Sequence, residues 1–107
     1  MWKEKLIFYD QLIASAPEIE RKGKTMLYTS ANGYMFSLFN KACEIGIRLP
    51  KEVGKQFMED HNTTIYKSYG AVMKGYVLIP ESLYNNMELL TATLRQGHEY
   101  VLSLPPK

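Results

Sequence analysis

The sequence has 107 residues, of which 46% are hydrophobic and 22% charged, and these fractions predict one compact domain rather than a disordered chain. Thirteen Lys and Arg residues against eleven acidic ones leave a net charge of +2, which is a weak electrostatic drive toward nucleic acid. The single cysteine, Cys43, excludes an internal disulfide. The sequence shows neither a signal peptide nor an apolar run close to the ~20 residues of a membrane-spanning helix, so we expect a cytoplasmic protein without a membrane partner.

Residues 2–16 have the periodicity of an amphipathic helix. Apolar side chains recur there at steps of three and four and share one face: Trp2, Leu6, Tyr9, Ile13 and Ala16. Pro17 is expected to end this helix, because proline disfavours the α conformation in the residue before it. Residues 18–24 contain the basic run ERKGK and are expected to form an exposed connection.

A three-stranded antiparallel meander is predicted for the next part of the sequence. Residues 25–30 and 34–39 are rich in β-forming side chains, and Asn32-Gly33 between them favours the positive φ angles of a tight hairpin turn. Alternation in the second strand predicts two faces: Tyr34, Phe36 and Leu38 on one, and Met35, Ser37 and Phe39 on the other. Alternation in the third strand predicts Ile45, Ile47 and Leu49 inward and Glu44, Gly46 and Arg48 outward.

Helices and strands alternate in the second half of the sequence. Pro50 suits the first position of a helix with a narrow apolar face. Residues 64–70 can hold a short strand, and residues 71–79 predict a longer strand inside the sheet, because both of its faces carry apolar groups. Pro80 opens another helical turn. Asn85 is expected to cap the last helix, with Glu88 as its capping-box partner.

The element order α-βββ-α-ββ-α(α) predicts an α+β fold. We expect one antiparallel sheet, made of the three-stranded meander plus one or two later strands, packed against the helices. Residues 1–107 are expected to form a single domain.

No combination of side chains in the sequence predicts catalysis or metal binding. Cys43 could act as a nucleophile with His61 or His98 as its base, but nothing in their sequence spacing places these residues together. Structural zinc needs four ligands at short pairwise spacings, which these three residues do not provide. The glycine-containing stretches lack a phosphate-binding pattern. We therefore expect no enzymatic activity, no catalytic residues, no metal and no cofactor.

Aromatic side chains are frequent, with eight Tyr, four Phe and one Trp. Most of them alternate with other apolar groups along the predicted strands, so we expect most to lie in the core. Tyrosine also favours protein interfaces, because it combines an apolar body with a polar tip. An RNA-binding sheet would expose strand aromatics beside Lys or Arg. Core burial, a protein interface and nucleic-acid stacking remain open, in that order of preference.

The stretches GKTMLYTSANGYMFSLFNKACEIGIRLPKE and SYGAVMKGYVLIPESL resemble the TfoX N-terminal domain family. The likeness covers about residues 22–104 and rests on packing and turn motifs: Met26, Met35-Phe36, Arg48-Leu49-Pro50, and the later pattern of Met73, Tyr76, Val77 and Pro80. The resemblance implies an α+β domain that often forms dimers. In its best-known setting this domain belongs to bacterial competence regulators that carry a second, helical domain. The resemblance implies no catalytic residues.

Two functions follow as expectations. The first is a non-enzymatic regulatory or protein-interaction module that self-associates, with a homodimer or another regulatory protein as its partner rather than nucleic acid directly. The alternative is a small-ligand- or nucleic-acid-binding protein that uses a basic and aromatic patch around Arg48. The candidate contacts are then Arg48, Lys41, Tyr69 and Lys74, where cations can meet an anionic group.

Overall fold

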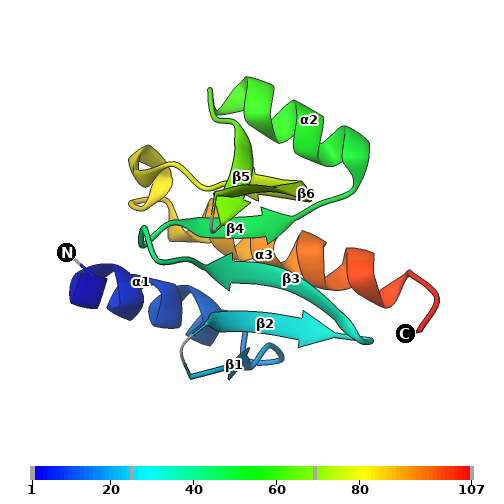
Figure 1. Ribbon diagram of the computed structural model, residues 1–107, viewed down its shortest axis with the longest axis horizontal. Coiled ribbons are helices and arrows are strands. Elements are labelled where there is room, and N and C mark those ends of the chain that lie inside the picture. Colours follow the sequence, from blue (N-terminus) through cyan, green and yellow to red (C-terminus); the bar gives the residue numbers. More distant parts are fainter. Residues whose placement is uncertain (1, 25, 69, 107) are drawn as a thin grey trace.

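A six-stranded antiparallel sheet with helices against one face forms the protein in the computed structural model, which describes residues 2–24, 26–68 and 70–106 (Figure 1). The elements in chain order are α1 (Trp2–Ala14), β1 (Arg21–Lys22), β2 (Leu27–Ala31), β3 (Tyr34–Phe39), β4 (Ile45–Arg48), α2 (Lys51–Asp60), β5 (Ile65–Ser68), β6 (Ala71–Leu78), a 3-10 turn (Glu81–Leu83) and α3 (Met87–Leu102). The strand order in the sheet is β1-β2-β3-β4-β6-β5. The predicted fold class and element order are confirmed, and β6 lies inside the sheet as expected.

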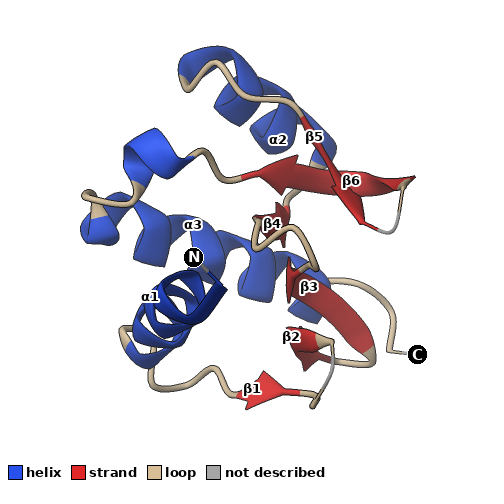
Figure 2. Cartoon of the chain, turned by 60° about the vertical axis from the view of Figure 1, so that its left-hand side comes forward, coloured by secondary structure: helices blue, strands red, loops and turns tan. Residues whose placement is uncertain are grey.

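The main hydrophobic core lies between the sheet and the helices, which cover the same side of it (Figure 2). Its fully buried side chains come from every layer, among them Tyr9 and Leu12 of α1, Phe36 of β3, Ile45 and Ile47 of β4, and Leu90, Leu94 and Val101 of α3. Gly97 lets α3 approach β4 closely, because a Cβ atom at this position would lie only 2.7 Å from the carbonyl oxygen of Arg48. The close packing of α3 on the sheet therefore depends on having glycine at position 97.

The predicted hairpin turn joins β2 to β3. Asn32 and Gly33 both have positive φ, 57° and 83°, as a tight two-residue turn requires. The side-chain amide of Asn32 also donates hydrogen bonds to the carbonyl oxygens of Val101 (3.0 Å) and Leu104 (2.8 Å). These carbonyls lie at the C-terminal end of α3, where helix acceptors lack partners within the helix. The turn thus fixes the end of α3 against the sheet.

A β-bulge in β3 makes the predicted alternation of this strand wrong beyond Phe36. Thr29 pairs with Ser37 and Ser30 pairs with Met35, so Phe36 is an extra residue without a partner in β2. Phe36, Ser37 and Phe39 consequently lie on the helix side, while Leu38 joins a cluster on the opposite face. The Ser37 hydroxyl completes a buried network, 2.7 Å from the Tyr9 hydroxyl and 2.6 Å from that of Thr29.

The second apolar cluster lies on the other face of the sheet and is centred on Leu38, Tyr66 and Tyr76. Tyr66 of β5 packs on Gly46 of β4, where a Cβ atom would collide with the tyrosine ring. Its hydroxyl donates to the carbonyl oxygens of Leu38 (3.2 Å) and Glu44 (2.9 Å). These contacts hold the β5–β6 pair against the meander and so position the end of the sheet next to α2.

Several element boundaries differ from the prediction, and α1 ends at Ala14 rather than at Ala16. The exposed connection after α1 contains β1, in which Arg21 and Lys22 pair with β2. Pro50 is the N-cap residue of α2 rather than its first residue. Asn86, not Asn85, caps α3, because its side-chain oxygen accepts a hydrogen bond from the N–H of Leu89 at 3.2 Å.

Candidate functional site

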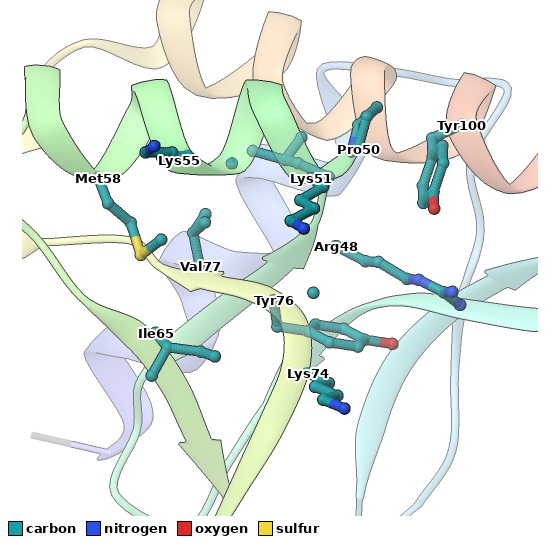
Figure 3. Close-up of a pocket in the computed structure, with 13 residues that line it drawn as sticks. Arg48, Pro50, Lys51, Lys55, Met58, Ile65, Lys74, Tyr76, Val77 and Tyr100 are labelled. Atoms are coloured by element: carbon teal, nitrogen blue, oxygen red, sulfur yellow. The ribbon is translucent and has the colours of Figure 1, made fainter.

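A pocket of about 580 Å³ lies between α2, the end of β4, the β5–β6 pair and the C-terminal part of α3 (Figure 3). This volume is in the range of small-molecule binding sites. The local sequence builds its centre, because β4 ends at Arg48 and Pro50 turns the chain directly into α2. The C-terminal end of β4 and the N-terminal end of α2 therefore border the same pocket.

Four cationic side chains line the pocket: Arg48, Lys51, Lys55 and Lys74. The described residues of its lining include no Asp or Glu, and none of the four cations forms an ion pair with a carboxylate in the described part of the chain. Lys51 and Lys55 are one helical turn apart, so they lie on the same face of α2. Like charges at this spacing destabilise a helix slightly. A bound anion would relieve that repulsion.

Arg48 is held at one end of the pocket by aromatic rings. Its guanidinium carbon lies 5.5 Å from the ring centroids of both Tyr34 and Tyr100, within the range of cation–π attraction. The neighbouring Tyr76 donates its hydroxyl hydrogen to the carbonyl oxygen of Met35 at 2.7 Å. Burial raises the pKa of Tyr76 to about 12, and the positive charge of Arg48 opposes that rise. The guanidinium thus lies beside two aromatic rings at this end of the pocket.

An irregularity in β6 places Lys74 at the pocket. Ile65 of β5 pairs with Val77, but Lys67 pairs with Val72, so β6 carries extra residues between these partners. Gly75 has a φ of 85°, which glycine adopts without strain, and its carbonyl oxygen accepts a hydrogen bond from the N–H of Leu49 at 3.0 Å. Bulges of this kind redirect side chains beside binding sites.

The rest of the lining is largely apolar. Met58 of α2, Ile65 of β5 and Val77 of β6 lie on the side of the pocket away from Arg48 (Figure 3). Gly54 of α2 also faces this space, and a Cβ atom there would stand 3.5 Å from the Val77 side chain. The pocket therefore combines a side with three cations and a largely apolar side on which Lys55 is the remaining cation.

The structure brings together two of the four residues predicted as contacts. Arg48 and Lys74 line the same pocket. Lys41 lies in the turn between β3 and β4, at the opposite end of β4 from Arg48, and does not line it. Tyr69 lies outside the described residues.

Sequence reasoning missed Lys51, Lys55 and Tyr100. The two lysines follow Pro50 at a spacing of one helical turn, and that spacing is a local signal that they share a face. The prediction for this helix considered only its apolar face. Tyr100 comes from α3, and only the tertiary fold brings it beside Arg48.

The remaining candidate groups have separate environments. Cys43 has a φ of 62° in the turn after β3. His61 lies against Phe57, with ring centroids 4.6 Å apart, and His98 lies 5.2 Å from Phe36. Within residues 2–24, 26–68 and 70–106, no three His, Cys, Asp or Glu residues are grouped so that they could hold a metal ion. None of the helices in these ranges has the length and apolar character needed to cross a membrane.

Comparison with known proteins adds no relative: no family model matches this chain, and no curated protein matches it. The resemblance to the TfoX N-terminal domain therefore stays a prediction.

Proposed function

We propose that this protein is a non-enzymatic binding module that takes up a small anionic molecule in the pocket at Arg48. The observation that carries the proposal is the set of four cations around one cavity whose described lining contains no carboxylate. Arg and Lys side chains bind carboxylates and phosphates through charge-assisted hydrogen bonds, which are stronger than neutral ones. Arg48 is half-buried, which removes part of the solvent that would otherwise screen its charge, whereas the three lysines are exposed.

The net charge of +2 supports a local site rather than an extended binding surface. The protein's basic residues are nearly balanced by its acidic ones, so the four cations of the pocket are a local excess. Lys51 stands in the first turn of α2, where the positive end of the helix dipole disfavours a cation by roughly 0.3–1 kcal/mol. A residue that conflicts with its local environment in this way is typical of a functional site.

The test is thermal unfolding in the presence of phosphate, pyrophosphate and citrate at low ionic strength. A ligand that binds only the folded state raises the melting temperature as its concentration rises. We expect the Lys51→Gln/Lys74→Gln variant to bind these anions about tenfold more weakly, because each charge-assisted hydrogen bond contributes about 1.5–3 kcal/mol before solvent screening. Lys24→Gln/Lys41→Gln removes an equal charge of two outside the pocket and is the matched control. Equal anion effects on all three proteins would contradict the proposal.

The self-associating regulatory module expected from the sequence is a second proposal. The free edges of the sheet, β1 and β5, support it, because an edge strand can pair with a second copy of the chain. Sedimentation at micromolar to high micromolar concentrations measures this directly. A concentration-dependent dimer would support self-association, and a single monomeric species throughout would exclude it. Titration with oligonucleotides at low salt tests the nucleic-acid alternative in the same samples.

A further inference from the structure

We infer that the ligand is an amphiphilic anion, with one anionic head group and a short apolar tail. This inference rests on the proposed function, because it assigns a chemical class to the same pocket. Its basis is that Arg48, Lys51 and Lys74 lie toward one side of the cavity, while Met58, Ile65 and Val77 lie toward the other, where Lys55 is the one cation among the labelled residues (Figure 3). A ligand that fills the whole pocket must match both ends.

The cationic end lies at the start of α2. Arg48, Lys51 and Lys74 lie on this side of the pocket and come from a strand end, a helix start and a bulged strand (Figure 3). Pro50, as the N-cap residue, provides no side-chain hydrogen bond to the first N–H groups of α2, so their positive dipole adds to the field of the three cations. An anionic head group is stabilised at this end.

The apolar end lies about two helical turns further along α2. Val77 is only 2% exposed and forms its base, and the partly buried side chains of Met58 and Ile65 border it. Gly54 leaves space between the helix and β6, since it has no side chain to fill it. Methionine adapts its shape to irregular apolar ligands. This end suits a short alkyl or aromatic group.

Two other classes of anion fit the pocket less well. An inorganic ion such as phosphate would contact only the cationic end and would leave the apolar surface in water. An extended polyanion would place charge against Met58 and Ile65, where the described lining gives it only Lys55 as a nearby cation. The lining therefore favours a single head group on an apolar tail, such as an alkyl phosphate or an alkyl carboxylate.

The experiment compares inorganic phosphate with butyl, hexyl and octyl phosphate, by calorimetric titration below the concentrations at which these compounds form micelles. All four compounds carry a phosphate group, so differences in their affinity report the contribution of the alkyl tail. We expect the affinity to rise from phosphate to octyl phosphate by up to about fourfold per methylene, which corresponds to ~0.8 kcal/mol for each CH₂ that leaves water. The Ile65→Thr and Met58→Gln variants are expected to flatten this rise. Ile7→Thr changes a 52% exposed isoleucine outside the pocket and is the matched control.

The outcomes separate the two proposals. Binding of phosphate and octyl phosphate with equal affinity would overturn the amphiphile and leave anion binding in place. A tail dependence that Ile65→Thr and Met58→Gln do not change, in variants whose circular dichroism shows them folded, would also overturn it. If none of the four compounds binds, the proposed function itself fails.

Discussion

Asn32 combines two functions that the sequence showed only in part. Its positive φ of 57° forms the hairpin turn, as Asn-Gly predicts. Its amide also donates to two carbonyl oxygens at the end of α3, residues distant in sequence. A turn motif is a local signal and can be predicted, but the helix end that a turn residue contacts depends on the whole fold.

Two variants of Asn32 separate these functions. Asn32→Gly keeps the backbone conformation and removes both hydrogen bonds, so we expect a loss of about 1–2 kcal/mol in the free energy of unfolding. Asn32→Ala removes the same bonds and keeps the Cβ atom at positive φ without the short polar side chain that lets asparagine adopt this conformation, which costs roughly 1 kcal/mol more than Asn32→Gly. Urea denaturation measures both. If the two variants lose equal stability, the turn conformation contributes nothing.

Buried tyrosines make the protein sensitive to alkaline pH. Burial raises the pKa of Tyr84 to about 12, like that of Tyr76, and also raises the pKa values of Tyr9 and Tyr66. In the unfolded chain these groups lose their protons near pH 10. The unfolded state therefore binds fewer protons than the folded state above that pH, so stability is intact below pH 10 and falls between pH 10 and 12.

Tyr84→Phe tests this pH dependence. The substitution preserves the stacked ring, whose centroid is 4.3 Å from that of Phe8, and removes the ionisable hydroxyl. We expect denaturant unfolding between pH 9 and pH 11 to show a smaller loss of stability for the variant than for the original protein. An equally steep loss in both proteins would show that ionisation of Tyr84 is not coupled to folding.

Two glycines in helices that face the sheet predict opposite effects for the same substitution. Gly54→Ala in α2 should stabilise the protein by up to about 1 kcal/mol, because its Cβ atom would make ordinary contacts of 3.5 Å with Val77 and 3.8 Å with Leu49. Gly97→Ala in α3 should destabilise it by about 1–3 kcal/mol, because its Cβ atom would press on the backbone of Arg48 at 2.7 Å. Thermal or urea unfolding of both variants measures whether each substitution raises or lowers stability. A change in the same direction for both would contradict the difference in packing between the two helices.

The order of the elements was predictable from the sequence, but details that depend on neighbouring elements were not. Period-two alternation and Asn-Gly are local signals, so the meander was predicted correctly. The bulge at Phe36 has no such signal, and it reverses the side-chain directions predicted for Ser37 and Leu38. The two adjacent asparagines before α3 cap equally well by sequence, and only the fold decides for Asn86.

At the scale of the whole molecule, the candidate site was half predictable. Arg48 was expected as an outward cation and Lys74 as a contact near it, and both line the pocket. The cavity itself requires α2 to lie over the bulged end of β6 and Tyr100 of α3 to reach Arg48. Such contacts join residues that are far apart along the chain, so periodicity and spacing do not reveal them.

The most direct test of the central claim is to titrate the isotope-labelled protein with hexyl phosphate and to follow its amide resonances by NMR. We predict saturable shifts confined to the lining of the pocket, at Arg48, Lys51, Gly75 and Tyr100, and none in the turn at Lys41. The same titration of the Lys51→Gln/Lys74→Gln variant should need about tenfold more ligand for half-saturation. Shifts spread over the surface without saturation, or no shifts at all, would contradict the proposal that this pocket binds an anion.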